Sequence, residues 1–501
     1  MIRREPRRRF AGAKPRLLKG PISAPEVGEE FPDIHVPGRF RVTPVSRSAR
    51  AFDPRYRLAT MRNGMIGWAL FNAYFALLLT HLSAQQLSGV GFLSDFILLL
   101  SCLGQLTVGS LVLRLPIRLP VAGTLFAIFM TWGTATTMLA NGEIGRSFYA
   151  AISYYILWGF FGIFIYAAVE MGVNLSPQIR KLIVAPWLIS LAFSGLVAVG
   201  QVAGLGFAKA LSPTGAFGEV FRPTGLADYT FMLGLQGVLG MAIVGARLRE
   251  RDLKWTEWIA VGFFMLVILI AQYRSLYYTG IALTGVLLLV LQFKRNRLKA
   301  LAMGGLGVAA IIVPLVLFPN KFIYGMRGAE NDPALMVRYA AWDQVRPVLA
   351  ERPLTGIGAD QNLMITTGVA SIDKYAGLTM DNFYRMVLIC YGYTGGLFMI
   401  LTMVALGIGL FMRYDGSRAA GVKTYTIAAL IVYAALLGVS TTGNSFVYRQ
   451  VGYSFAVLLA LGTPSWAERR LVDPVSPLLA FARTLARTPL RTLFPNLGRV
   501  R

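Results

Sequence analysis

Apolar runs and polar joints alternate along the chain from about residue 64 to residue 463. Each run is about 20 residues long, the length that an α-helix needs to cross the hydrocarbon core of a bilayer. The pattern predicts about twelve membrane-spanning helices. Their expected ranges are 64–82, 94–113, 119–140, 147–169, 183–204, 228–246, 257–273, 276–293, 301–318, 384–412, 424–442 and 446–463. The run 384–412 is long for one span, so that helix is expected either to tilt or to extend past the membrane.

The joint between the ninth and tenth spans, residues 319–383, differs from all the others. Most joints contain a few residues, whereas this one contains about 65, and connections of that length are usually functional or disordered. It is rich in Arg, Asp, Trp and Tyr and has no low-complexity stretch, so we expect it to fold. An apolar chain that gathers its polar residues in one place is expected to do its work there.

The Lys and Arg residues predict the orientation, because short loops rich in these residues stay on the cytoplasmic side. On one side the joints contain Arg114 and Arg118, Arg180 and Lys181, Arg247, Arg249, Arg251 and Lys254, Lys294, Arg295, Arg297 and Lys299, and Arg413, Arg418 and Lys423. The short joints of the other side contain only Arg146, Lys209, Arg222, Arg274 and Arg449. The alternation predicts that both termini are cytoplasmic and that 319–383 lies on the opposite side, which we call the outer side.

Composition agrees with a membrane protein, since 55% of the 501 residues are hydrophobic and 15% are charged. A soluble chain would carry about 25% charged residues. The net charge of +25 comes largely from the cytoplasmic joints and from two basic tails, residues 1–62 and 464–501. The first tail is Pro-rich and lacks apolar periodicity, which is typical of disorder. Membrane topology and attraction to anionic lipid headgroups explain this charge without a nucleic-acid partner.

The sequence argues against metal and nucleotide chemistry. Cys102 and Cys390 both fall in predicted spans, which indicates no disulfide framework. His35 and His81 are far apart in the sequence, so no zinc site is expected. A glycine-rich phosphate loop is missing, which disfavours ATP hydrolysis. Neither internal repeats nor matched helix-breaking segments are found, although transporters built from repeats tend to show them.

Two outer arginines stand at the ends of spans. Arg222 lies in Phe221-Arg222-Pro223-Thr224-Gly225, and Arg274 lies where two apolar runs meet with almost no joint. Arg274 could extend to lipid headgroups, and Arg222 could pair with Glu219 or Asp228. Both also suit a lipid pyrophosphate, because a guanidinium group is permanently charged and binds phosphate in a bidentate fork.

The long outer joint contains three further patterns. Residues 336–342 have helical character, and residues 352–360 form a turn with one Pro and two Gly. The joint ends in Asp381-Asn382, and nine residues later comes Gly392-Tyr393-Thr394-Gly395. Structural explanations exist for these residues, because Asn before a helix is an ordinary N-cap and glycines allow close helix packing.

Taken together, these motifs resemble the O-antigen ligase and O-antigen polymerase superfamily of bacterial envelope glycosyltransferases. The resemblance covers residues 64–463 and is most specific in the order and common side of four motifs. They are Arg222-Pro223-Thr224-Gly225, Arg274, the run from Arg338 and Trp342 to Pro353-Leu354-Thr355-Gly356-Ile357-Gly358, and the stretch from Asn382 to Gly395.

The resemblance implies an all-α polytopic membrane protein, a GT-C-like bundle of about 12 transmembrane helices with one large periplasmic loop between spans 9 and 10. It implies a bacterial inner-membrane enzyme that transfers a glycan from undecaprenyl pyrophosphate with inversion, without metal or other cofactor. The implied catalytic residues are Arg222 and Arg274 on the pyrophosphate and Asp381 with Asn382 at the acceptor hydroxyl. The implied substrate-binding residues are Arg338, Asp360 and Trp342.

The sequence departs from the ligase pattern at Asp381, where ligases carry His before the Asn. An imidazole titrates near neutral pH, whereas an ordinary Asp has a pKa of about 4 and is a weak base. The departure favours a polymerase of the Wzy type that builds exopolysaccharide, capsule or O-antigen, with a flippase and a chain-length regulator as expected partners. Two alternatives stay open: a ligase that transfers glycan to lipid A-core or protein, and a transporter or flippase of the lipid-linked unit.

Overall fold

The structure is a computed structural model of the chain. It describes residues 54–81, 91–117, 119–141, 161–211, 223–227, 230–271, 273–276, 345–358, 382–417, 419–441 and 449–465, with Gly159, Gly280, Glu468 and a few isolated residues between 285 and 305. The chain divides into two units, residues 1–57 and 58–501, and every contact described below lies within the second.

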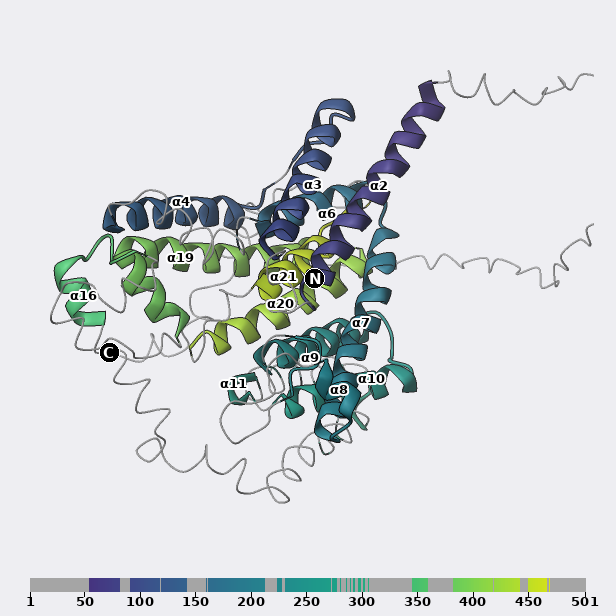
Figure 1. Cartoon of the computed structure of the whole chain (residues 1–501). Coiled ribbons are helices and arrows are strands. Elements are labelled where there is room, and N and C mark those ends of the chain that lie inside the picture. The colour runs from purple at the N-terminus through teal and green to yellow at the C-terminus, as the bar shows by residue number, and fades with distance from the viewer. Residues whose placement is uncertain are drawn as a thin grey trace, which may run out of the picture. The chain divides into compact units, whose positions relative to one another are not determined.

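All described secondary-structure elements are helices (Figure 1). They are α2 (Pro54–Leu79), α3 (Gly91–Val112), α4 (Val121–Asn141), α6 (Phe161–Leu175), α7 (Ile179–Val202), α8 (Gly206–Ala210), α9 (Thr230–Gly245), η2 (Ala246–Arg249), α10 (Trp255–Ile270), α11 (Arg274–Leu276), α16 (Val345–Glu351), α19 (Phe383–Gly416), α20 (Ala420–Val439) and α21 (Arg449–Leu461).

Six of the described helices are long and apolar enough to cross a bilayer: α3, α4, α7, α9 with η2, α19 and α20. Helices α6, α10 and α21 are shorter and apolar. The predicted spans 276–293 and 301–318 lie almost wholly outside the described residues, and each of the other ten ranges overlaps a described helix. The described residues therefore form the helices of a polytopic membrane protein. The total of twelve spans stays a prediction.

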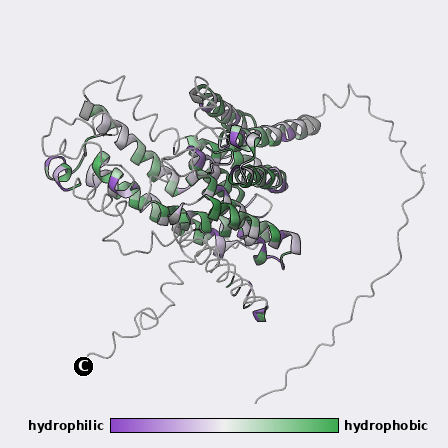
Figure 2. Ribbon diagram, turned by 60° about the horizontal axis from the view of Figure 1, so that its bottom comes forward, coloured by the Kyte–Doolittle hydropathy of each residue, from purple (hydrophilic) through white to green (hydrophobic). Residues whose placement is uncertain are grey.

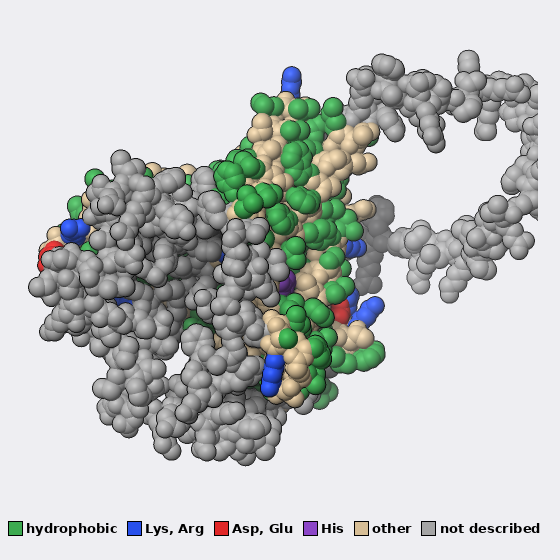
Figure 3. All heavy atoms as spheres, viewed as in Figure 1, with side chains coloured by type: hydrophobic (Ala, Val, Ile, Leu, Met, Phe, Trp, Pro, Cys, Tyr) green, Lys and Arg blue, Asp and Glu red, His purple; other side chains and the backbone are tan. Residues whose placement is uncertain are grey.

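Burial separates a central helix from peripheral ones. Every residue of α9 from Phe231 to Gly245 is buried, so the apolar side chains of this helix pack on other helices. Helices α3, α4, α7 and α19 instead leave large apolar side chains exposed, such as Leu111, Leu139 and Ile189. Hydrophobic residues run along most of the length of the helices (Figure 2), and hydrophobic side chains dominate the visible faces of α2 and α3 (Figure 3). Such exposed apolar faces suit a lipid environment and would aggregate in water.

Helix pairs with extensive contact define the bundle. Helix α9 packs against α10, α7 and α20, while α4 lies along α19 (Figure 1). Buried polar side chains join α2, α3 and α6: Ser101 Oγ donates to Asn72 Oδ1 (2.6 Å), Asn72 Nδ2 to Gln105 Oε1 (2.7 Å), and Gln105 Nε2 to the Ala168 carbonyl (2.9 Å). Mutual hydrogen bonding of this kind holds helices together where lipid tails offer no partners.

Contacts between joints agree with the predicted alternation of sides. Joints assigned to the cytoplasmic side contact one another, and so do joints assigned to the outer side. The cytoplasmic contacts join Arg62 to the Leu175 carbonyl, Thr424 to Glu250, and Arg180 to Glu468, and the outer contacts join Arg449 to Asp95 and Asn382 to the Thr441 carbonyl. Which of the two sides faces the cytoplasm stays a prediction from the charges.

Arg180 does more than mark a cytoplasmic joint. Its side chain is almost fully buried, and its Nε and Nη2 donate to the Leu461 and Thr463 carbonyls at 3.0 and 2.6 Å. Its Nη1 and Nη2 also bind both carboxylate oxygens of Glu468, at 2.8 and 2.7 Å. Burial opposes ionisation of Glu468, but the bonds from Arg180 and the Ser465 N–H outweigh it and lower the pKa of the carboxyl to about 2. This contact fixes the end of α21 to the start of α7.

The long predicted span 384–412 corresponds to a broken helix, which the two sequence-based explanations did not include. Helix α19 runs for 34 residues and contains one residue with non-helical angles, Gly392, at φ 64° and ψ −166°. This region of backbone space is accessible almost only to glycine. The extra length of the apolar run therefore reflects a break, and α19 consists of a short outer segment and a long one.

Candidate functional site

The first turns of α9 contact two outer joints, the one that follows Arg222 and the one that contains Arg274. The joint after Arg222 is described from Pro223 to Ala227, and the second begins at Tyr273 and continues into α11, whose first residue is Arg274. A Cβ on Gly225 would lie 2.9 Å from Leu233, so the first joint reaches α9 there. The ring of Phe231 is 5.2 Å from that of Tyr273, and a Cβ on Gly234 would lie 2.5 Å from Leu276. Residues 231–234 of α9 therefore contact both joints.

The joint after Arg222 is itself held by a buried glutamine. Gln201, near the end of α7, accepts hydrogen bonds from the backbone N–H groups of Thr224 (3.1 Å) and Gly225 (3.0 Å). Its amide nitrogen donates to the carbonyls of Gly225 (3.1 Å) and Ala208 (3.2 Å). The sequence pattern around Arg222 thus adopts a turn whose backbone polar groups are satisfied inside the protein.

Asn382 is the N-cap of α19, as the structural explanation of the sequence predicts. Its Oδ1 accepts from the Arg385 N–H (3.1 Å) and its Nδ2 donates to the Thr441 carbonyl (2.7 Å). The Phe383 N–H also donates to the Ser440 carbonyl (3.1 Å). Asn382 therefore joins the start of α19 to the end of α20, and α20 also contacts α9 and α11. The part of Asn382 in a reaction stays a prediction.

The turn at residues 352–358 binds to the break in α19. The N–H groups of Ile357 and Gly358 donate to the carbonyls of Ile389 (3.0 Å) and Cys390 (2.9 Å), and the Tyr393 N–H donates to the Pro353 carbonyl (2.8 Å). In an unbroken helix residues 389 and 390 would accept from residues 393 and 394. The turn replaces these lost hydrogen bonds, so two separate sequence motifs form one structural unit.

Helix α16, which the sequence patterns did not reveal, supports this unit. Val345 and Val348 of α16 pack with Ile357 of the turn and Ile389 of α19 in a small apolar cluster. The short helix ends at Glu351, just before the turn. The described part of the long outer joint is therefore folded onto the outer segment of α19, as expected for a joint without low-complexity sequence.

Arg385 is a candidate site residue that the sequence reasoning did not single out. It lies in the first turn of α19, three residues after Asn382, and its side chain is 1% exposed. The sequence offered one signal for Arg385, its charge within the apolar run 384–412. Burying a charge near the bilayer is costly, so such a residue is a candidate for function. We add Arg385 to the candidate site.

Arg449, by contrast, has a structural partner. Its Nη1 donates to Asp95 Oδ2 at 2.9 Å, and the Tyr453 hydroxyl donates to Asp95 Oδ1 at 2.9 Å. Both side chains of the ion pair are almost fully buried, at 8% and 4% exposure. This pair joins α21 to α3, so Arg449 is not counted among the candidate site residues.

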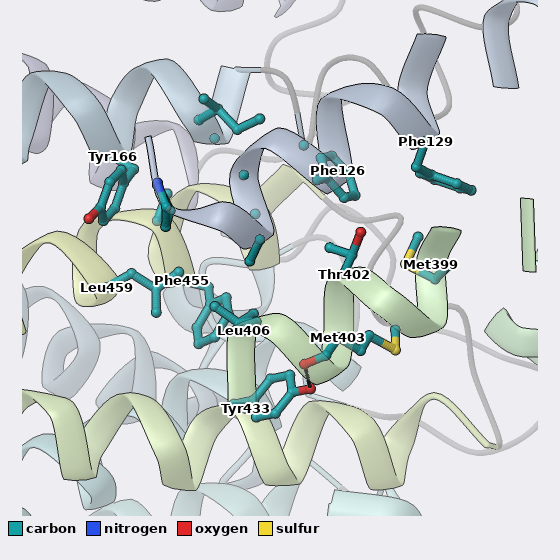
Figure 4. A pocket seen from close by; sticks show the side chains of 18 of the residues that line it. Phe126, Phe129, Tyr166, Met399, Thr402, Met403, Leu406, Tyr433, Phe455 and Leu459 are labelled. Carbon is teal, nitrogen blue, oxygen red and sulfur yellow. Dashed lines mark hydrogen bonds between the residues drawn. The ribbon is translucent and has the colours of Figure 1, made fainter. Parts of the chain in front are cut away.

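An apolar cavity of about 160 Å³ lies beside the middle of α19, where Met399, Thr402 and Leu406 line it (Figure 4). Its walls come from α4, α6, α19, α20 and α21, and they include Phe383, the residue after Asn382. Phe126, Met403 and Phe455 are among the side chains that line it, and the Tyr433 hydroxyl donates to the Met403 carbonyl (2.6 Å) at its edge.

Several predicted site residues lie outside the described part of the chain: Arg222, Arg338, Trp342, Asp360 and Asp381. The structure brings the neighbours of Arg222 and Arg274 together on α9 and places Asn382 at the end of α20. Within the described residues no group of three His, Cys, Asp or Glu side chains is placed to hold a metal ion.

The fold and these joints define the class as a polytopic helical membrane protein with a folded outer segment bound to a broken helix. Residues 259–400 match the family model described as O-Antigen ligase, which confirms the resemblance to the O-antigen ligase and polymerase superfamily. The match runs from α10 into α19 and includes Arg274, the turn at 352–358 and the break at Gly392. Arg222 precedes it. No curated protein matches the chain significantly.

Proposed function

We propose that the protein is a polysaccharide polymerase that joins repeat units linked to undecaprenyl pyrophosphate on the outer face of the bacterial inner membrane. The observation that carries the proposal is the match of residues 259–400 to the family model. This segment contains Arg274, and the joint that begins at Tyr273 packs on α9, as does the joint that follows Arg222. In the reaction, an acceptor hydroxyl oxygen attacks the anomeric carbon of the donor glycan. The bond from that carbon to the pyrophosphate oxygen breaks, and the pyrophosphate leaves with the electron pair.

Arg222 and Arg274 bind the donor pyrophosphate in this proposal. Negative charge grows on the leaving oxygen as the glycosidic bond breaks, and guanidinium groups held in place beforehand stabilise that charge. The packing of both joints on α9 supports this assignment, because a rigid, buried helix holds the two backbones at a constant separation.

Asp381 orients the acceptor hydroxyl and accepts its proton, and Asn382 holds the backbone next to it as the cap of α19. Arg338, Trp342 and Asp360 contact sugar or phosphate groups of the two substrates. The reaction needs no metal or nucleotide in this scheme, because the pyrophosphate leaving group already activates the donor.

A ligase is the second candidate, since the matched family is described as O-Antigen ligase. Asp at position 381, where ligases carry His, favours the polymerase. Deletion of the gene separates the two functions. Loss of a polymerase leaves single repeat units, whereas loss of a ligase leaves finished polymer on its lipid carrier.

A transporter of the lipid-linked unit is disfavoured by the buried polar side chains of the described bundle. Several of these side chains bind one another, as Asn72 does with Gln105 and His81 does with Ser190 and Gln236. A transport path would instead present such groups to its cargo. Turnover of the donor by reconstituted protein without an ion gradient would exclude a transporter.

The decisive experiment incubates purified protein with a defined undecaprenyl-pyrophosphate repeat unit and sizes the products. A ladder of polymer lengths is expected from the wild type, and Arg222→Ala or Arg274→Ala is expected to abolish long products while the protein still accumulates in the membrane. Normal chain lengths in both variants would refute the assignment of these arginines.

A further inference from the structure

Gln201 makes an unusually complete contact with the joint that follows Arg222. The side chain is 1% exposed and forms four hydrogen bonds to backbone groups, two as acceptor and two as donor. Three of these bonds go to Thr224 and Gly225, and the fourth goes to Ala208 of α8. One amide group thus holds two consecutive residues of the turn and a second helix.

Ser194, two turns before Gln201 on the same face of α7, binds the same turn. Its Oγ accepts from the Leu226 N–H (3.1 Å). Gly225 has φ 62°, and a Cβ there would lie 2.7 Å from both the carbonyl oxygen and the Oγ of Ser194. The turn is therefore inserted against α7 with no space for a side chain at residue 225.

The covalent link between this turn and Arg222 runs through a proline. Arg222 is bonded to Pro223, which is buried and whose ring fixes φ near −65°. Peptide bonds are planar. Between the Thr224 nitrogen, which binds Gln201, and the Cα of Arg222, the ψ angle of Pro223 is the single soft torsion. Holding Pro223 and Thr224 therefore limits the directions in which the backbone can continue toward residue 222.

We propose that Gln201 is a positioning residue for the donor pyrophosphate: it holds the Pro223–Gly225 turn so that Arg222 meets the phosphate without reordering. This inference rests on the proposed function and extends it to a residue that touches neither substrate. Preorganisation of this kind matters because a displacement of about 1 Å in a charged group can cost about 100-fold in rate.

The test is a double-mutant cycle between Gln201→Met and Arg222→Ala. Methionine keeps the length and burial of the side chain and removes all four hydrogen bonds. The matched control is Gln105→Met, because Gln105 is also fully buried and hydrogen bonded, but it joins α3 to α2 and α6. Each single variant and each double variant is purified, checked for thermal unfolding, and assayed for polymer formation and for binding of undecaprenyl pyrophosphate.

Gln201→Met is expected to lower kcat/KM for polymer formation and the affinity for undecaprenyl pyrophosphate by about 10- to 100-fold in the wild-type background. In the Arg222→Ala background, which forms no long polymer, it is expected to change that affinity by less than about 3-fold. Gln105→Met is expected to have the same effect in both backgrounds. Equal effects of Gln201→Met in the two backgrounds, or no effect in either, would overturn the inference.

The binding assay distinguishes this inference from the proposed function. If the wild type binds undecaprenyl pyrophosphate but forms no polymer, the polymerase proposal fails, and the same cycle measured by binding decides the role of Gln201. If the wild type forms polymer and the cycle is additive, the polymerase proposal stands and Gln201 is structural. If the wild type neither binds nor polymerises, both proposals are wrong.

Discussion

Gly392→Ala tests whether the break in α19 and its contact with the outer turn are required by the fold. Alanine at φ 64° and ψ −166° is strained by about 1–3 kcal/mol. Its Cβ would also lie 2.5–2.6 Å from the carbonyl carbon and oxygen of Leu354 and the carbonyl oxygen of Pro353. These are backbone atoms, so the turn must move away and its three hydrogen bonds to α19 weaken, at about 0.5–1.5 kcal/mol each.

These contributions add to a loss of about 2.5–7.5 kcal/mol in the free energy of unfolding. The control is Gly409→Ala in the same helix, where an added Cβ meets no atom within 4 Å. There alanine is expected to be neutral or to stabilise by up to about 1 kcal/mol, because it reduces the freedom of the unfolded chain. Thermal unfolding in detergent compares the two variants, and the midpoint of Gly392→Ala is expected to be lower by roughly 3–8 °C.

A local measurement accompanies the global one. Cys390 is fully buried beside the break, and in a Cys102→Ala background it is the one thiol of the chain. Maleimide labelling of Cys390 is expected to be slow in the parent and in Gly409→Ala and fast in Gly392→Ala. Equal unfolding midpoints and equal protection of Cys390 in both glycine variants would refute the reasoning, because the helix could then run unbroken without the turn.

Three further changes test other parts of the structure. Asn382→Ala removes the cap of α19 and its bond to Thr441, so it is expected to cost about 1–2 kcal/mol of unfolding free energy in denaturant titration. The pKa of Glu468 is about 2 in the folded protein, against 4.5 for an ordinary Glu, so the stabilisation by Arg180 is fully present above pH 4.5 and is lost as the pH falls toward 2. The difference in unfolding free energy between wild type and Glu468→Gln should vanish over that range. A constant difference would contradict the ion pair. Gly225→Ala is expected to reduce thermal stability and polymer formation together, whereas Gly206→Ala, with open space around it, should change neither.

The helices were largely predictable because a bilayer imposes one local rule. Every backbone polar group inside hydrocarbon must be satisfied within its own segment, so an apolar run of about 20 residues forms a helix wherever it lies. The run 94–113 corresponds to α3 (Gly91–Val112), and the run 228–246 corresponds to α9 (Thr230–Gly245). Local composition also predicted the turn at residues 352–360, of which 352–358 are described, and it offered an N-cap as one explanation of Asn382.

Distant contacts were not predictable from local pattern. From the sequence, Gly392 could be interpreted as a residue for close helix packing. The break at Gly392 was not predictable, because the groups that bind the backbone of the broken helix belong to residues 353–358. Arg180 counted as one more cytoplasmic charge, although the structure buries it between Leu461, Thr463 and Glu468. Gln201 carried no signal in an apolar run, since its four partners are backbone groups that have no sequence signature.

Hydrophobic pattern, charge distribution and motif order were thus enough to predict a polytopic helical membrane protein that resembles the O-antigen ligase and polymerase superfamily, and residues 259–400 match that family's model. They depend on the chain's interaction with its solvent, and each segment interacts with lipid or water largely on its own. Only the tertiary structure revealed three features: the break in α19, the turn that binds to it, and the hydrogen bonds of Gln201 to the joint after Arg222. Each feature pairs polar groups from segments that are separate in the sequence.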